Sequence, residues 1–294
     1  MQGLKIGHYT DVQNGTGISV FLLEKARGAY LLCGSGPASH ELGPLEVNTS
    51  VDEVHALVLS GGSAFGLFSA KGVMQFLVEN KIGVMLPHGV VPIVPAAAIY
   101  DLAYKNPVYP NDEQAYQACL NAKENNNSFG NIGAGTGATV GKLIPHAECM
   151  PGGFGYAEMS LGNGVEIIVC AVVNAVGDIL ENNKIISGAK LADGSFANCA
   201  NFLMQATHNK NIFPTANTSL VAVFVNAKFS KSELQRIAKM AIAGMARAIA
   251  PVFTCYDGDL MFVFSVGDKS ASVINVGTAA AELVNRAIVK AVKE

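Results

Sequence analysis

The run Leu220-Val221-Ala222-Val223-Phe224-Val225 restricts the fold of this chain more than any other stretch. Six consecutive apolar residues, four of them β-branched or aromatic, are typical of a strand that is covered on both faces. The polar segment Thr215-Ala216-Asn217-Thr218-Ser219 leads directly into this run. By itself the segment predicts an ordinary loop, since Ser and Thr often precede a strand. A nucleophilic hydroxyl at the first residue of such a strand would, however, have a rigid support.

The rest of the chain contains several more runs of the same kind. They predict strands over 17–23, 55–60, 166–173 and 260–264. Apolar residues recur at helical spacing after Ser63, the expected N-cap, and after the capping box formed by Ser230 and Glu233. Further helices are expected over 111–122 and 278–292. Runs of strands separated by a few long helices favour layered sheets covered by helices.

The composition excludes several classes of protein. Charged residues make up 15% of the 294 residues, hydrophobic residues 50%, and the net charge is -3. The low charge predicts compact packing and buried contacts between subunits, and the absence of a basic stripe argues against nucleic acid and membrane surfaces. The apolar stretch 82–103 is interrupted by prolines, so a membrane span is not expected. Scattered cysteines and a polar N-terminus favour the cytoplasm.

No metal or cofactor is expected. The six histidines show no zinc-binding spacing, and there is no G-x-S-x-G elbow. The glycine-rich run from Gly130 to Lys142 is not a dinucleotide fingerprint, because an asparagine loop precedes it where a strand is required. It is not a P-loop either, because Thr136 occupies the first glycine position and Leu143 the Ser/Thr position. Backbone N–H groups in glycine turns can bind an anion or an oxyanion, with close packing as the alternative interpretation. The candidates for such binding are Gly61, Gly62, Ser63, Gly133 and Gly135.

Seven blocks in the right order carry a resemblance to a known family. They are Ser60 to Leu67, Val91 to Ala97, Gly130 to Lys142, Val173 to Asp178, Asn217 to Ser219, Gly244 to Ile249, and Asp257 to Asp259. Together they resemble the DmpA-type aminopeptidase family of autoprocessed, N-terminal-nucleophile-like hydrolases. This family includes L-aminopeptidase/D-esterases, β-peptidyl aminopeptidases and endo-type 6-aminohexanoate (nylon) oligomer hydrolases. The similarity runs over nearly the whole chain.

The resemblance implies a single domain over 1–294 with an α/β (α+β) fold. The expected architecture is the four-layer αββα sandwich of the DmpA/ornithine acetyltransferase type. Members of the family cut themselves immediately before a Ser or Thr. In this chain the cut would fall between Asn217 and Thr218 and give fragments 1–217 and 218–294. The polar stretch 181–216 would be the linker that leads to the cut.

The resemblance also implies the site. Thr218 would be the nucleophile, with Asp257 and Asp259 beside it. Lys142 and Asn174 would complete the site, and Tyr100 would donate to the oxyanion. Independently, residues two apart on an extended chain share a face, so both aspartates can point at one site. The alternative is a plain Asp-Gly turn between strands.

The implied activity is that of an amidohydrolase or aminopeptidase. After cleavage, Thr218 would attack the carbonyl of a peptide-like or oligoamide substrate and form an acyl-enzyme. An acyltransferase of the ornithine acetyltransferase type and a non-catalytic binding protein are the alternatives. The substrate stays open between L- or D-aminopeptides, β-peptides and nylon-type oligomers, and cleavage between exo and endo. A homo-oligomer, as a tetramer, is expected.

The chain departs from the family pattern at several positions. Ile242 and Ala243 stand where many relatives carry His-Asp, and Ala250 and Phe253 stand where they carry Arg and His. Cys33-Gly34-Ser35 replaces an early Arg-Gly-Gly. The proposed nucleophile and its carboxylates are unaffected. We therefore expect this chain to differ from the family in its substrate pocket and its subunit contacts.

Overall fold

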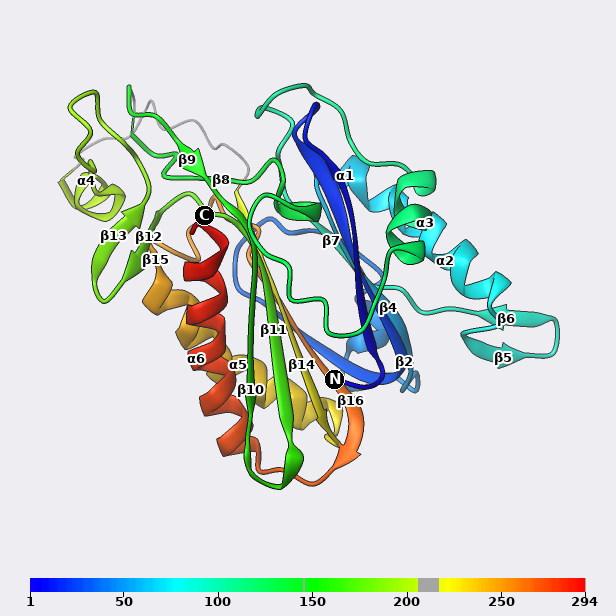
Figure 1. Cartoon of the computed structure of the whole chain (residues 1–294). Helices are drawn as coiled ribbons and strands as arrows, with labels where there is room; N and C mark the ends of the chain where they lie inside the picture. The colour runs from blue at the N-terminus through cyan, green and yellow to red at the C-terminus, as the bar shows by residue number, and fades with distance from the viewer. Residues whose placement is uncertain (145, 206–216, 294) are drawn as a thin grey trace.

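The framework of the protein is two β-sheets that lie face to face and share one long strand. The structure is a computed structural model that describes residues 1–144, 146–205 and 217–293. The shared strand is β2 (Thr16–Leu32). A register shift between Leu22 and Ala26 divides it, so that its first half pairs in one sheet and its second half in the other (Figure 1). The shared strand thereby couples the two sheets.

The first sheet has the strand order β1-β2-β4-β7-β3. Its neighbours are antiparallel except for β4 and β7. Helices α2 (Ala70–Glu79) and α3 (Asp112–Leu120) cover its outer face, where apolar side chains of strands and helices form one cluster. The other strands of this sheet are β1 (Leu4–Asp11), β3 (Ala38–His40), β4 (Val54–Ser60) and β7 (Ala96–Ala98).

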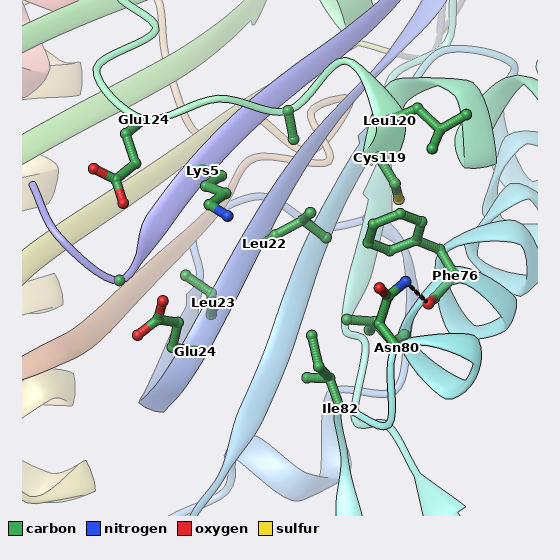
Figure 2. A pocket seen from close by; sticks show the side chains of 13 residues that line it. Lys5, Leu22, Leu23, Glu24, Phe76, Asn80, Ile82, Cys119, Leu120 and Glu124 are labelled. Carbon is green, nitrogen blue, oxygen red and sulfur yellow. Dashed lines mark hydrogen bonds between the residues drawn. The ribbon is translucent and has the colours of Figure 1, made fainter.

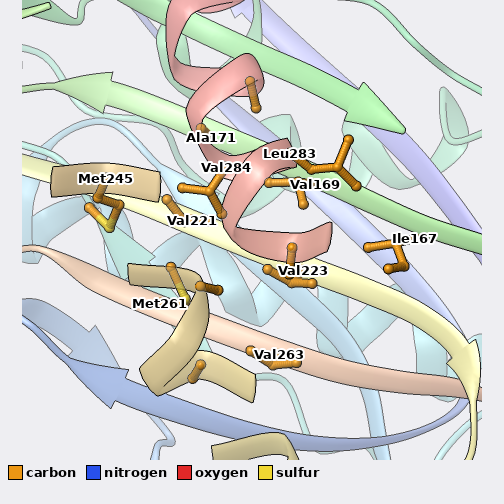
Figure 3. Packing of buried hydrophobic residues seen from close by; sticks show 14 of the residues in the cluster. Ile167, Val169, Ala171, Val221, Val223, Met245, Met261, Val263, Leu283 and Val284 are labelled. Atoms are coloured by element: carbon orange, nitrogen blue, oxygen red, sulfur yellow. The ribbon is translucent and has the colours of Figure 1, made fainter. Parts of the chain in front are cut away.

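The second sheet has the order β10-β11-β14-β16-β2, and only β14 and β16 run parallel. Helices α5 (Lys231–Ala248) and α6 (Val273–Ala291) cover its outer face. Figure 3 shows this layer, in which Val223 of β14, Val169 of β11 and Leu283 of α6 belong to one buried cluster. The other strands of this sheet are β10 (Gly153–Ser160), β11 (Glu166–Asn174), β14 (Thr218–Ala227) and β16 (Leu260–Lys269).

Successive side chains along the strands of the second sheet point to opposite faces, and both faces are packed with apolar side chains. In β14, Val221 and Val223 face α5 and α6, whereas Ala222 and Phe224 face the first sheet. Burial of an aliphatic or aromatic side chain of this size contributes about 1.5–3 kcal/mol. The strand that the sequence predicts to be covered on both faces is therefore confirmed. Helices, sheet, sheet and helices follow one another as the four layers of the expected αββα sandwich.

Smaller elements surround the sandwich. The hairpin of β5 and β6 projects from the side of the first sheet, and β12, β13, β15 and α4 gather beyond one end of α6 (Figure 1). No helix in the described ranges is long and apolar enough to cross a membrane. The bounds of these elements are β5 (Val84–Leu86), β6 (Gly89–Val91), β8 (Thr139–Val140), β9 (Met150–Pro151), β12 (Asp178–Glu181), β13 (Lys184–Ser187), β15 (Ile249–Ala250), α1 (Ser63–Gly66) and α4 (Cys199–Gln205).

Three local predictions need correction. Ser63 is not an N-cap: Gly62 holds that position with a left-handed φ of 83°, and Ser63 is the first helical residue. The last helix begins at Val273, five residues before its predicted start. The first part of the expected linker is structured, because β13 and α4 lie within it. Residues 206–216 of the linker lie outside the described residues. The capping box of Ser230 and Glu233 is confirmed.

Candidate active site

The strand order brings three distant segments to one end of the second sheet. Thr218 is the first residue of β14. Since β14 and β16 are parallel, the loop before β16 lies beside this start, and Asn217 forms a bridge with Asp257. Since β11 is antiparallel to β14, its last residue, Asn174, is the register partner of Thr218. The sequence separates Asn217 from Asp257 by 40 positions and Asn174 from Thr218 by 44, yet each pair is adjacent in the fold.

The side chains at this end point between the two sheets. Thr218 and Asn174 are buried and lie in register with the strand positions that face the first sheet. The Asn174 amide donates to the carbonyl oxygen of Tyr100, just beyond β7, at 3.2 Å. Lys142 Nζ donates to Asn174 Oδ1 at 2.5 Å and to Asn174 O at 3.2 Å. The structure therefore places Thr218, Asn174, Lys142 and Tyr100 in one cluster.

The carbonyl group of Asn217 receives two hydrogen bonds. Thr218 Oγ1 donates to its oxygen at 2.6 Å, and the N–H of Gly258 donates to the same oxygen at 2.6 Å. A Cβ at Gly258 would lie 2.6 Å from Thr218 Oγ1, so the close approach requires glycine. Gly258 is a residue that sequence reasoning missed as a donor. Its position between two aspartates was the available signal.

The carboxylate of Asp259 holds the backbone just after Thr218, and the carboxylate of Asp257 holds its own loop at Thr254. Asp259 Oδ1 accepts the N–H of Ser219 at 2.7 Å, and its Oδ2 accepts the N–H of Phe253 at 3.3 Å. Asp257 Oδ2 accepts the N–H of Thr254 at 2.8 Å and its hydroxyl at 2.7 Å. Asp257 Oδ1 is buried and has no hydrogen-bond partner among the described residues. The segment is therefore more than a plain Asp-Gly turn.

Burial shifts the titration of all three charged groups towards neutrality. It raises the pKa of Asp257, and it raises the pKa of Asp259 together with the negative charge of Asp257. Burial lowers the pKa of Lys142 to about 7, although Cys149, Asp257 and Asp101 act in the opposite direction. A lysine with a pKa near neutrality can accept a proton at physiological pH. Perturbed groups of this kind cluster at functional sites.

The predicted anion-binding turn serves packing instead. The N–H of Gly61 donates to Gly17 O at 2.9 Å, that of Gly62 to Asp101 Oδ1 at 2.6 Å, and that of Ser63 to Ile99 O at 2.8 Å. A Cβ at Gly61 would lie 2.1 Å from Asp101 Oδ2. All three donors are thus engaged inside the protein.

Two backbone N–H groups of the glycine-rich run, Gly130 to Lys142, are also engaged inside the protein. The N–H of Gly133 donates to Thr10 Oγ1 at 2.9 Å, and that of Gly135 donates to Ile132 O at 2.9 Å. A Cβ at Gly135 would lie 2.2 Å from the backbone nitrogen of Phe154 in β10. The glycines of this run let its backbone pack against the sheet and carry Lys142 to the site. The packing interpretation therefore describes Gly133 and Gly135.

A cavity of about 320 Å³ adjoins the cluster, and Tyr100 and Lys142 belong to its lining. Figure 2 shows a separate cavity of about 310 Å³, where Leu22, Phe76 and Cys119 are among the lining residues. None of the candidate catalytic residues lines this second cavity. Over residues 1–144, 146–205 and 217–293, no group of three or more His, Cys, Asp or Glu side chains is arranged to hold a metal ion.

Comparisons with known proteins agree with this geometry. Peptidase family S58 matches the chain over residues 1–294. A Mycobacterium leprae protein described as an uncharacterized aminopeptidase is 31% identical, over 99% of this chain and 88% of the relative. A 6-aminohexanoate-oligomer endohydrolase of Kocuria sp. is 28% identical, over 85% of this chain and 75% of the relative. The L-aminopeptidase D-Ala-esterase/amidase of Ochrobactrum anthropi, a variant of the Ntn hydrolase fold, superimposes with a TM-score of 0.72 at 16% identity, over 99% of this chain and 84% of that chain.

The chain therefore belongs to peptidase family S58. It is a hydrolase that acts on peptide or amide bonds. The resemblance to the DmpA-type family is confirmed, and so is the expected sandwich fold.

Proposed function

We propose that this protein is an amidohydrolase that activates itself by cutting between Asn217 and Thr218. The observation that carries the proposal is the pair of hydrogen bonds on the Asn217 carbonyl, from Thr218 Oγ1 and from the N–H of Gly258, at 2.6 Å each. The first places a hydroxyl against the carbonyl of the bond to be cut. The second is a donor that can stabilise negative charge on the carbonyl oxygen.

Self-cleavage proceeds in two steps. Thr218 Oγ1 attacks the carbonyl carbon of Asn217 while its proton passes to a base, for which neutral Lys142 is suited by its pKa of about 7. The C–N bond breaks, the nitrogen of Thr218 takes up a proton, and an ester joins Asn217 to the Thr218 hydroxyl. Water then hydrolyses the ester. The products are a new carboxylate on Asn217 and a free α-amino group on Thr218.

Turnover of a substrate repeats this chemistry. The α-amino group of Thr218 titrates near 8 in model compounds and can serve as the base for its own hydroxyl. Once Asn217 has left, the N–H of Gly258 is free to donate to the carbonyl of the substrate. Tyr100 remains a candidate second donor. Each preorganised donor of this kind is typically worth about 2.7–4 kcal/mol.

Asp257 and Asp259 orient the nucleophile. Asp259 accepts the N–H of Ser219. Asp257 Oδ1 is buried, has no hydrogen-bond partner within the described part of the chain, and suits the amine that cleavage creates at Thr218. Asn174 and Lys142 fix the opposite side of the site through their mutual hydrogen bonds. The relatives named aminopeptidase and 6-aminohexanoate-oligomer endohydrolase support an amide substrate.

The proposal is tested by whether the purified chain is cleaved before Thr218. On a denaturing gel and by intact mass, the wild type should give two fragments that divide before Thr218. Thr218→Ala should stay whole and inactive on amide substrates. Ser219→Ala is the matched control, because its buried hydroxyl has no partner among the described residues and should be dispensable. A wild-type chain that stays whole and has no amidase activity would contradict the proposal.

We also propose that the protein assembles as a homo-oligomer, as a tetramer. Large apolar side chains are exposed on the side of the first sheet: Phe68 is 76% exposed, and Met85 of the projecting β5–β6 hairpin is 71% exposed (Figure 1). Burying them against other copies would remove this surface from water. Light scattering after size exclusion measures the mass directly. A monomeric mass would overturn this assembly.

A further inference from the structure

The loop 251–259, between β15 and β16, carries both candidate carboxylates, and its first half holds them. The N–H of Phe253 donates to Asp259 Oδ2 at 3.3 Å, and the N–H of Thr254 donates to Asp257 Oδ2 at 2.8 Å. Phe253 has a φ of 57°, in the left-handed region that a bulky side chain seldom adopts. Backbone strain of this kind clusters at functional sites. Here it accompanies two consecutive N–H groups that are aimed at the two carboxylates.

The hydroxyl of Thr254 is a second donor to Asp257, and its direction is fixed. Its oxygen lies 3.2 Å from the backbone nitrogen of Tyr256 and 2.7 Å from Asp257 Oδ2. Because an N–H can only donate, the hydroxyl accepts from Tyr256 and gives its own proton to Asp257. Asp257 Oδ2 thus receives two hydrogen bonds from one residue.

These two bonds leave the other carboxylate oxygen of Asp257 available. Its Oδ1 is buried and has no hydrogen-bond partner among the residues that the structure describes. The backbone of Asp257 is held separately, because its carbonyl oxygen accepts the N–H of Ser35 at 2.7 Å and that of Gly36 at 3.1 Å. A bridge to Asn217 places this backbone next to the bond that would be cut. With the main chain fixed, the contacts with Thr254 set the orientation of the carboxylate.

We infer that Thr254 is a positioning residue for substrate turnover, whose hydroxyl holds Asp257 so that Oδ1 receives the α-amino group of Thr218 after cleavage. The inference rests on the proposed function and adds to it a residue that acts only through Asp257. Self-cleavage does not depend on this contact, because the precursor has no free amine on Thr218.

The same contacts favour the charged form of Asp257. Burial raises the pKa of Asp257, whereas the hydroxyl and the N–H of Thr254 lower it. Among the charged neighbours, Lys142 also lowers it, and Asp259 forms a pair of carboxylates with it. Without the hydroxyl, a proton shared by the Asp257 carboxylate and the Thr218 amine would be held more tightly, whichever group carries it. Activity should therefore be lost at a higher pH on the acidic side.

The test compares Thr254→Val, which removes the hydroxyl and keeps the shape of the side chain, with the matched control Thr254→Ser, which keeps the hydroxyl. Both variants should be cleaved before Thr218 like the wild type. For the mature proteins, kcat/KM is measured against pH with L-alanine p-nitroanilide or, where the wild type hydrolyses it faster, a 6-aminohexanoate oligomer. The acid-side midpoint of Thr254→Val should rise by about 0.5–1 pH unit, which lowers kcat/KM below both midpoints by about three- to tenfold. The midpoint of Thr254→Ser should stay at the wild-type value.

A loss in Thr254→Val that is equal at every pH would overturn the inference, because a purely structural role lowers the amount of active enzyme without moving the midpoint. A midpoint that moves as far in Thr254→Ser, or a folded Thr254→Val chain that stays uncut, would overturn it as well. Thr254→Ala removes the hydroxyl without a branched side chain and takes the place of Thr254→Val if the valine prevents folding. Absence of any hydrolysis that depends on Thr218 in the wild type contradicts the proposed function itself.

Discussion

Replacing Gly258 with alanine should slow self-cleavage by about 100-fold without unfolding the protein. The φ of Gly258 is not left-handed, so the backbone accepts alanine. Its new Cβ would lie 2.6 Å from Thr218 Oγ1, whereas ordinary contact begins at 3.4 Å. On the other side, Gly36 O at 2.8 Å and Pro37 Cα at 3.1 Å prevent the methyl group from retreating. The hydroxyl must therefore move by about 0.8 Å, the difference between these two distances.

The displacement sets the size of the effect. A shift of about 1 Å in a reacting group can cost about 100-fold in rate. We therefore expect cleavage of Gly258→Ala to slow by about 100-fold. Stability should change little, because the lower entropy of the unfolded alanine chain, worth about 0.4–1 kcal/mol, offsets part of the steric cost.

The assay follows the intact chain after cell-free synthesis, with denaturing gels at increasing times and intact mass of the products. Gly36→Ala is the matched control, because Gly36 lies in the neighbouring loop against Gly258, and nothing lies within 4 Å of a Cβ at Gly36. It should be cleaved at the wild-type rate. Cleavage of Gly258→Ala within about twofold of the wild-type rate would refute the role given to this close approach.

Two further predictions concern the charged groups. Self-cleavage should accelerate as pH rises through about 7, because Lys142 becomes neutral there, and Lys142→Arg should slow it at least tenfold and remove this rise, since arginine stays protonated. Asp257→Asn should lower amide turnover at least tenfold, because it removes the carboxylate proposed to hold the new amine of Thr218. It should also stabilise the fold by about 1 kcal/mol, or about 2–4 °C in Tm at neutral pH, because it removes a buried charge that repels Asp259.

The pH dependence of each variant distinguishes the proposed role of the residue from a general loss of stability. Burial raises the folded-state pKa of Asp257, so its ionisation costs stability above that pKa and the cost disappears as pH falls below it. The Tm advantage of Asp257→Asn should therefore shrink towards acidic pH; an advantage that grows there would contradict the account. For Lys142, cleavage is measured in preference to turnover, because the precursor has no free amine on Thr218. If the rate of self-cleavage of Lys142→Arg still rises through about pH 7, the base that accepts the proton of Thr218 is a group other than Lys142.

Local sequence patterns predicted a helix or strand correctly where the element is determined by its own residues. The strand at 220–225 and the helix that begins after Ser230 follow from hydrophobic runs and a capping box, whose physical causes lie within a few residues. The end of a helix is less well determined. Serine is a residue type that favours the N-cap, yet Gly62 and not Ser63 takes that position. The reason is that the carboxylate of Asp101, far along the chain, accepts the N–H of Gly62 and holds the turn. Long-range contacts of this kind leave no local signal.

At the candidate site, too, some features follow from the sequence and others only from contacts between distant segments. The sequence by itself determined the family, the layered αββα sandwich and the candidate residues Thr218, Asp257 and Lys142. Only the tertiary structure decided that the N–H of Gly258 meets the Asn217 carbonyl and that Gly61 and Gly133 serve packing. The reason is physical. Side-chain type and periodicity act along the chain, whereas the direction of a backbone N–H depends on the pairing of strands that meet only in the folded protein.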